Sequence, residues 1–476
     1  MKKENKTLVN LSTKTFIQVV VLLFVLMLVA IVLTYVIPKG EFGTTADGKT
    51  DYLDYRAVEG AKGIPVWKGL LAPFLVFGSD NGLTLIMLSL FLVMVFAAFQ
   101  VMNDVGGIRA LVGAVARRFR KRRALLLCMV ALVFMAFGAF LGLFEEMLSM
   151  LPIVTALCVL IGYDSFTGFL VCIIACGFGF ASAITNPFTV LLASEIIDAN
   201  PMENIWYRVI IFAVMYLLLL GFVFLYVKKL RKDPASSLTL AHDETLREAG
   251  AADEQNPIAP QDEKRIRLTY IVFLLVCLGL IIACSAISAL RDYTVVVLIA
   301  YFLIFGLLAG FLSAKAAKPV FLSFWKGIVG ALPTIVFIAL ASSIKYIFDE
   351  GAIMPTIVHS INTLVSGHSP FLVALVLYAI ILVLEFFISS STAKAILVMG
   401  MLAVVSVPLS KQMLVLIYTF ADGYTNVLFP TSPVLLISLS MIGIDYFKWV
   451  KKSVPLFLVN LALVVAFLAL GIALGY

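Results

Sequence analysis

Apolar runs long enough to cross the ~30 Å hydrocarbon core of a bilayer recur along the whole chain. The clearest are Phe16–Ile37, Leu83–Val101, Leu125–Leu143, Val209–Val227, Leu268–Ile287, Val295–Leu312, Phe371–Phe387 and Val454–Leu474. Only 13% of the 476 residues are charged, which is about half the share usual in a soluble domain. The sequence therefore predicts an all-α polytopic membrane protein. The first run lacks a small-residue cleavage site, so we expect a retained membrane helix there.

Clusters of basic residues predict the orientation of the chain. They lie at Lys2-Lys3, Arg117–Arg123, Lys228–Lys232, Lys264–Arg267 and Lys448–Lys452. Short basic loops remain in the cytoplasm, so we expect a cytoplasmic N-terminus in the cytoplasmic (inner) membrane of a bacterium. The segment Lys39–Lys62 then lies outside. Nucleic-acid binding is the other common use of basic clusters, and a chain this apolar does not favour it.

A seven-residue phrase occurs twice, 240 positions apart. Residues Phe180–Asn186 read Phe-Ala-Ser-Ala-Ile-Thr-Asn, and residues Phe420–Asn426 read Phe-Ala-Asp-Gly-Tyr-Thr-Asn. The same offset pairs Glu145 with Glu385, and Trp206-Tyr207-Arg208 with Tyr446-Phe447-Lys448. A register kept at three separated points indicates a duplicated module, which is typical of secondary transporters.

The charges beside the last helix of each half predict that the halves are inverted. Lys228–Lys232 follow the last apolar run of the first half, whereas Lys448–Lys452 precede the last run of the second. We therefore expect repeat one over 1–230, with its transport part at 124–228, and a cytoplasmic linker tolerant of substitution over 231–267. Residues 268–476 then hold a connecting helix and repeat two, with its transport part at 370–476.

Signals for the start of a helix occur inside apolar stretches of both halves. Asn186-Pro187 combines a capping residue with a proline suited to a first helical turn, and Ser432-Pro433 does the same. We expect broken helices there, with Gly177, Gly179 and Gly423 loosening the backbone. Their free N–H groups would suit a carboxylate and their free carbonyls a cation. The alternative is a proline kink satisfied by neighbouring helices.

Charged residues at membrane depth cost about 2.5–3.5 kcal/mol each and need a reason. The candidates are Glu145, Glu146, Glu385 and Asp422, and the alternative is that these carboxylates mark helix ends at the membrane interface. Lys394 follows the polar cluster Ser389–Thr392, a candidate re-entrant hairpin. It is either a counter-charge to a buried carboxylate or a residue that reaches the interface. We expect Arg208 to anchor its helix at the interface.

These patterns define the candidate site residues. For substrate binding they are Glu145, Glu146, Ser182, Thr185, Asn186, Ser390, Ser391, Thr392, Asp422, Asn426, Thr431 and Ser432. For a coupling ion they are Glu385, Asp422, Thr185, Thr425, Asn186 and Asn426. We expect no catalytic residue, and the six cysteines show neither metal-ligand spacing nor an expected disulfide. No cofactor is expected, and Na⁺ or H⁺ is the candidate coupling ion.

Several phrases resemble the anaerobic four-carbon-dicarboxylate carrier family and its YfcC-like branch, within the ion transporter superfamily. They are Thr34–Phe42, Glu145-Glu146 before Pro152, Ser182–Thr189 and Ala421–Pro433. The resemblance covers essentially the full length. It implies inverted repeats with re-entrant hairpins, elevator-type alternating access and a homodimer. It links related members to dicarboxylates, to arginine–ornithine exchange, or to peptides and other amino acids.

We therefore expect a secondary active transporter in the lipid bilayer for a small carboxylate-bearing metabolite. The acidic candidates match an amino group, so an amino acid such as arginine or ornithine is favoured. The alternative substrate is a four-carbon dicarboxylate coupled to Na⁺ or H⁺. A channel or a membrane-embedded enzyme is the alternative class, but the chain has no phosphate-binding glycine loop and only three histidines.

Overall fold

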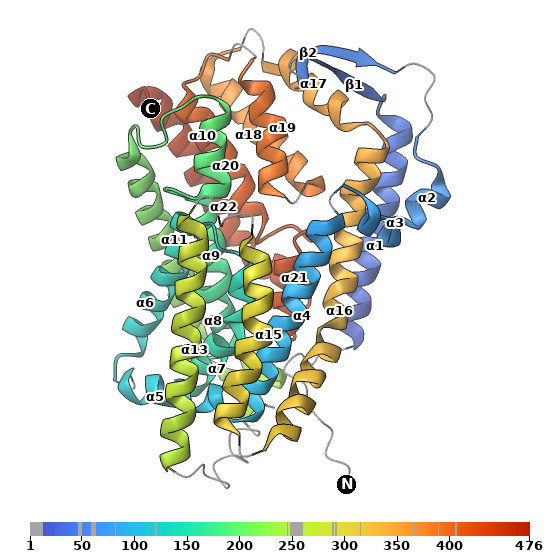
Figure 1. The fold of residues 1–476 in the computed structure, drawn as a ribbon. Helices are drawn as coiled ribbons and strands as arrows, with labels where there is room; N and C mark the ends of the chain where they lie inside the picture. Colours follow the sequence, from blue (N-terminus) through green and yellow to red (C-terminus); the bar gives the residue numbers. More distant parts are fainter. Residues whose placement is uncertain are drawn as a thin grey trace.

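The computed structural model describes most of the chain. The described residues are 13–45, 50–58, 63–80, 82–119, 121–244, 246–247, 260–287, 290, 293–314, 316–365, 368–388, 390–404 and 407–476. Over these residues the protein is a bundle of helices with one two-stranded sheet at one end (Figure 1).

Nine helices in the described part of the chain are long and apolar enough to cross a membrane. They are α1 (Thr13–Val36), α4 (Gly82–Asp104), α6 (Arg123–Ala136) with its π-helical extension η2 (Phe137–Leu141), α11 (Ile205–Lys232), α13 (Pro260–Ala286), α15 (Thr294–Ser313), α16 (Ala317–Glu350), α18 (Pro370–Phe387) and α22 (Tyr446–Leu474). The chain is therefore mostly helical, and its long apolar helices support the prediction of a multi-pass membrane protein. The small sheet was not predicted. Helix α13 begins at Pro260, inside the segment that we expected to be linker.

Helices α1, α4, α15 and α16 form one packed unit, which we call the scaffold. Helix α16 lies along both α4 and α1, and α15 packs on α4 (Figure 1). Close approach depends on glycine, because a Cβ on Gly327 of α16 would overlap the backbone of Ala97 in α4. Small residues at such crossings are typical of helices that associate in lipid.

A small antiparallel sheet covers the end of the scaffold away from the N-terminus (Figure 1). Strands β1 (Gly40–Thr44) and β2 (Thr50–Ala57) pair with a register shift between Phe42 and Gly43. Tyr55 stacks on His359 of α17 (Met354–Val365), with the ring centroids 4.1 Å apart. Three short elements, α2 (Val66–Leu70), α3 (Ala72–Leu75) and η1 (Val76–Gly78), lead from the sheet to α4.

The remaining elements form two series in the same order: a long helix, a short helix, a helix that ends at a break, a short half-helix and a long helix. The first series is α6–η2, η3 (Glu145–Ser149) with α7 (Leu151–Leu160), α8 (Ser165–Phe169) with η4 (Leu170–Ile174) and α9 (Ala175–Ala181), η5 (Pro187–Leu191) with α10 (Leu192–Ile196), and α11. The second is α18, α19 (Ser391–Leu402), α20 (Lys411–Thr425), α21 (Pro433–Met441) and α22. Helix α5 (Gly107–Phe119) joins α4 to the first series. The short helix η6 (Pro234–Ser236) follows α11, the last helix of that series.

The final helices of the two series run in opposite directions. Near the start of α11, the Tyr207 hydroxyl donates a hydrogen bond to the carbonyl of Phe467, 2.5 Å away near the end of α22. Towards the other end of α11, the ammonium of Lys452 lies 5.1 Å from the ring centroid of Tyr226. Helices α11 and α22 are therefore antiparallel neighbours, as the positions of the basic clusters predicted.

Candidate substrate and cation site

The first series is broken between α9 and η5. Asn186 lies in this break and is fully buried. Its Oδ1 accepts a hydrogen bond from the backbone N–H of Phe188 (2.9 Å), and its Nδ2 donates to the carbonyl of Gly138 in η2 (3.2 Å). The side chain thus caps the half-helix, as the Asn-Pro signature predicted, and also ties it to the neighbouring span.

The second series is broken between α20 and α21, and its capping differs. Ser432 Oγ accepts from the backbone N–H of Leu435 (3.4 Å) at the start of α21. Asn426 instead donates from its Nδ2 to the carbonyl of Asp422 (3.1 Å) near the end of α20. The two asparagines of the repeated phrase therefore serve opposite helix ends, where unpaired N–H groups and carbonyls respectively need partners.

The glycines before the breaks hold two helices together, which corrects our expectation that they loosen the backbone. Gly177 and Gly179 lie within α9, and Gly423 lies within α20. A Cβ on Gly423 would overlap the backbone of Ala181, and a Cβ on Gly177 would overlap the side chain of Val427. Gly423 allows the backbones of α9 and α20 to come into contact, whereas Gly179 allows α9 to approach the backbone of Met135 in α6.

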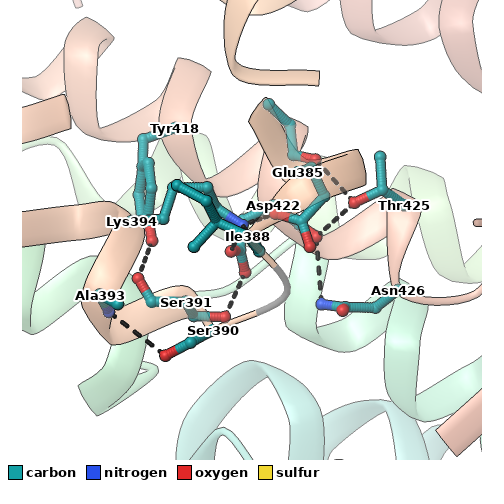
Figure 2. Close-up of polar contacts among 11 residues, drawn as sticks. Glu385, Ile388, Ser390, Ser391, Ala393, Lys394, Tyr418, Asp422, Thr425 and Asn426 are labelled. Atoms are coloured by element: carbon teal, nitrogen blue, oxygen red, sulfur yellow. Dashed lines mark hydrogen bonds and ion pairs between the residues drawn. The ribbon is translucent and has the colours of Figure 1, made fainter. Parts of the chain in front are cut away.

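A buried lysine lies where α18, α19 and α20 meet (Figure 2). The Lys394 side chain has no exposed surface. Its Nζ lies 2.7 Å from Oδ1 of Asp422, forms an ion pair with Glu385, and donates a hydrogen bond to the carbonyl of Ile388 (3.2 Å). An ammonium has three N–H donors, so each has an acceptor. Of the two roles that the sequence left open, Lys394 takes the counter-charge role.

Hydroxyl groups fix the rest of this cluster. Ser391 Oγ donates to Oδ2 of Asp422 (2.8 Å), and the Tyr418 hydroxyl donates to the carbonyl of Ser391 (Figure 2). Ser390 caps α19 by accepting from the backbone N–H of Ala393 (3.3 Å). Both carboxylate oxygens of Asp422 therefore have protein partners.

The acidic pair of the first series has a different environment. The chain turns at Gly142, with a left-handed φ of 68°, and enters η3 at Glu145. Glu145 is exposed, whereas Glu146 is partly buried. Glu146 has a buried Oε2 without a hydrogen-bond partner. Among the described residues, neither glutamate forms an ion pair.

Other predicted site residues bond mainly to the backbone. The hydroxyls of Ser182, Thr185 and Thr425 donate to the carbonyls of Phe178 (2.6 Å), Phe140 (3.3 Å) and Ala421 (3.1 Å) respectively. Thr392 is exposed and Thr431 is buried. Each of these hydroxyl oxygens can also accept a hydrogen bond from a ligand.

Arg208 lies in the first turn of α11 and is buried by other parts of the protein. The residue is 3% exposed and donates a hydrogen bond to the carbonyl of Ala183 (3.4 Å) in the break of the first series. The sequence pattern did not predict this contact, and anchoring at the membrane interface stays a prediction.

The sequence profile of DcuC, described as the C4-dicarboxylate anaerobic carrier, matches residues 16–473. The chain belongs to this family. A putative basic amino acid antiporter of Escherichia coli, YfcC, is 26% identical over 92% of each chain. An uncharacterized protein of Haemophilus influenzae is 24% identical over 75% of this chain and 69% of its own. The solved YdaH transporter of Alcanivorax borkumensis is 15% identical, with a TM-score of 0.48 over 96% of this chain and 99% of that one.

Membership in a carrier family places the chain among transporters and argues against an enzyme. The family description names dicarboxylates, whereas the E. coli relative is named for basic amino acids. The substrate must therefore be argued from the chain's own residues.

Proposed function

We propose that this protein is a secondary active transporter that moves an amino acid, such as arginine or ornithine, across the cytoplasmic membrane of a bacterium. The observation that carries the proposal is the pair of broken helices that cross at Gly423. Their free ends lie beside buried carboxylates, an arrangement suited to a zwitterionic or cationic substrate. The protein works as a homodimer with a cytoplasmic N-terminus, and it has no catalytic residues.

Inverted repeats are supported by the way the two series pack on each other. Besides the antiparallel α11 and α22, α10 of the first series packs against α19 of the second, and α21 of the second packs against η3 of the first. Each half-helix thus packs against the short helix that follows the first long helix of the other series. In an elevator mechanism, the transport parts 124–228 and 370–476 move together against the scaffold.

The substrate class follows from the charges. The capped start of η5 at Asn186 offers N–H groups and a positive helix end to a carboxylate. Glu145 and Glu146 have no protein cation of their own, so they offer a partner to an amino group. The alternative substrate, a four-carbon dicarboxylate, is favoured by the family description. It would need Na⁺ or H⁺ to offset these glutamates.

A ligand screen by thermal shift tests the proposal, because a ligand that binds the folded state raises its apparent stability. Purified protein is heated with arginine, ornithine or succinate, each with and without Na⁺. We expect arginine to raise the melting temperature of the wild type and of Glu41→Gln, which alters an exposed glutamate of β1. The Glu145→Gln/Glu146→Gln variant should lose this shift. A Na⁺-dependent shift with succinate and none with arginine would instead support the dicarboxylate alternative.

A further inference from the structure

The surroundings of Lys394 are those of a metal-cation site. Its ammonium is held by the carboxylates of Glu385 and Asp422 and by the carbonyl of Ile388, which caps the C-terminal end of α18. Hard cations such as Na⁺ prefer oxygen ligands of these types, and carbonyls at helix C-termini attract positive charge. The lysine thus fills a position that could otherwise hold an alkali cation.

Repeat one has two glutamates near its break, and neither forms an ion pair with a described lysine or arginine. Glu145 begins η3, whereas Glu385 lies near the end of α18, so the two carboxylates occupy different places in their series. The unpaired Oε2 of Glu146, one residue from Glu145, is an independent sign that this half lacks a cation.

We propose that Lys394 is a tethered cation that permanently fills the oxygen-lined site in repeat two, so that no external cation binds there. The proposal does not depend on the identity of the substrate. Removing one partner of a buried ion pair leaves an uncompensated charge, which is strongly unfavourable. A Lys394 variant must therefore recruit a replacement, either Na⁺ or a proton.

The test measures melting temperature without substrate, as a function of Na⁺ concentration at constant ionic strength and as a function of pH. Three proteins are compared: wild type, Lys394→Met, and Lys394→Met/Asp422→Asn. The double variant removes one negative charge together with the ammonium. The ionisable groups that face Lys394 are Glu385 on α18, and Asp422 and Tyr418 on α20, with Glu145 on η3 near Asp422.

We expect Lys394→Met to melt below the wild type at about pH 8, where carboxylates are ionised, when choline replaces Na⁺. Its melting temperature should rise with acidification, and it should rise with Na⁺ more steeply than that of the wild type. The double variant should return to the wild-type dependence on Na⁺. A purely structural salt bridge would instead give Lys394→Met the same dependence on Na⁺ as the wild type, because protons alone would neutralise the unpaired carboxylates.

Three results would overturn the proposal. The first is a melting temperature of Lys394→Met that depends on Na⁺ no more steeply than that of the wild type. The second is a double variant whose melting temperature depends on Na⁺ as steeply as that of Lys394→Met. The third is a Lys394→Met protein that neither Na⁺ nor acidification stabilises. Because no substrate is present, a failed ligand screen would leave this test valid, and the two proposals can fail separately.

Discussion

Four carboxylates and one ammonium lie around the two helix breaks. Lys394 offsets only one of the charges on Glu385 and Asp422, and it leaves Glu145 and Glu146 without a partner. Neighbouring carboxylates repel one another, and buried ones such as Glu385 and Asp422 favour a nearby cation. A site with this charge favours a cationic or amino-bearing ligand, or coupling to Na⁺ or H⁺, over an unaccompanied dianion.

At the residue scale, the Asn186 side chain has two roles, which two variants can separate. It caps η5 and it links η5 to η2. Asn186→Ala loses both the bond to Phe188 and the bond to Gly138, so we expect destabilisation of about 1 kcal/mol or more and loss of transport. Asn186→Asp keeps the acceptor and loses only the donor to Gly138. Thermal unfolding and uptake in proteoliposomes measure both effects. If Asn186→Ala transports normally, the half-helix start does not bind substrate.

Asn426→Ala tests the other break in the same assays. Because Asn426 bonds to the carbonyl of Asp422 rather than to a helix start, we expect this variant to lose uptake while it keeps its fold. Normal uptake by both alanine variants would contradict the site assignment.

The crossing of α9 and α20 gives a second prediction at this scale. Gly423→Ala places a methyl group against the Ala181 backbone, and overpacking of this kind costs about 1–3 kcal/mol. The matched control is Gly221→Ala in α11, where an added Cβ meets nothing within 4 Å. Thermal unfolding should show a lower melting temperature for Gly423→Ala alone. Equal melting temperatures would mean that the backbones are not in contact.

The role of Lys394 shows how far the sequence alone could go. The offset of 240 indicated Glu385 and Asp422, but Lys394 lies nine residues after Glu385 on the other side of a Ser-rich break. Its two carboxylate partners become neighbours only because α19 folds back onto α18 and α20, and the spacing of residues in the sequence does not specify this fold-back. A lysine near an apolar run is equally compatible with the membrane interface, so burial decided between the two interpretations.

At the element scale, the segment after α11 has a buried anchor. Asp243 accepts hydrogen bonds from the backbone N–H of Ser165 (3.1 Å) and from Thr239 Oγ1 (2.7 Å), and Asp164 caps the same helix start through Thr167. The segment therefore closes the N-terminal end of α8. We therefore expect Asp243 to tolerate substitution less well than the exposed residues of the linker.

Asp243→Ala removes the acceptor of the Ser165 N–H and of the Ser165 hydroxyl, and each lost partner of this kind costs about 1–3 kcal/mol. We expect a lower melting temperature and faster tryptic cleavage of the linker than in the wild type. Glu244→Ala, which alters the exposed neighbouring residue, should change neither. Equal behaviour of the two variants would show that the anchor does not hold the segment.

Element prediction succeeded where a local signal was strong and failed where it was interrupted. Asn186-Pro187 and Ser432-Pro433 placed both half-helix starts correctly, because capping and proline geometry are local. Helix α16 was absent from the predicted runs because Lys326 and Pro333 interrupt its apolar pattern. Packing of α16 against α4 and α1 keeps it helical, and such tertiary support is not visible in the sequence.

At the scale of the whole molecule, the proposed function includes a defined orientation of the chain in the membrane, with a cytoplasmic N-terminus. In a background without native cysteines, Leu53→Cys in β2 should react with a membrane-impermeant maleimide in intact cells, because that side chain is 65% exposed and lies on the predicted outer side. Glu244→Cys should react only after permeabilisation. The opposite labelling pattern would reverse the orientation and assign the basic loops to the exterior.

The central claim is that the acidic site of repeat one binds a cationic amino acid during transport. The most direct measurement is counterflow of labelled arginine into proteoliposomes loaded with unlabelled ornithine. The account predicts transient accumulation by the wild type and by Glu41→Gln, and none by Glu145→Gln/Glu146→Gln. Accumulation of labelled succinate against unlabelled succinate in the presence of Na⁺, without arginine counterflow, would contradict it.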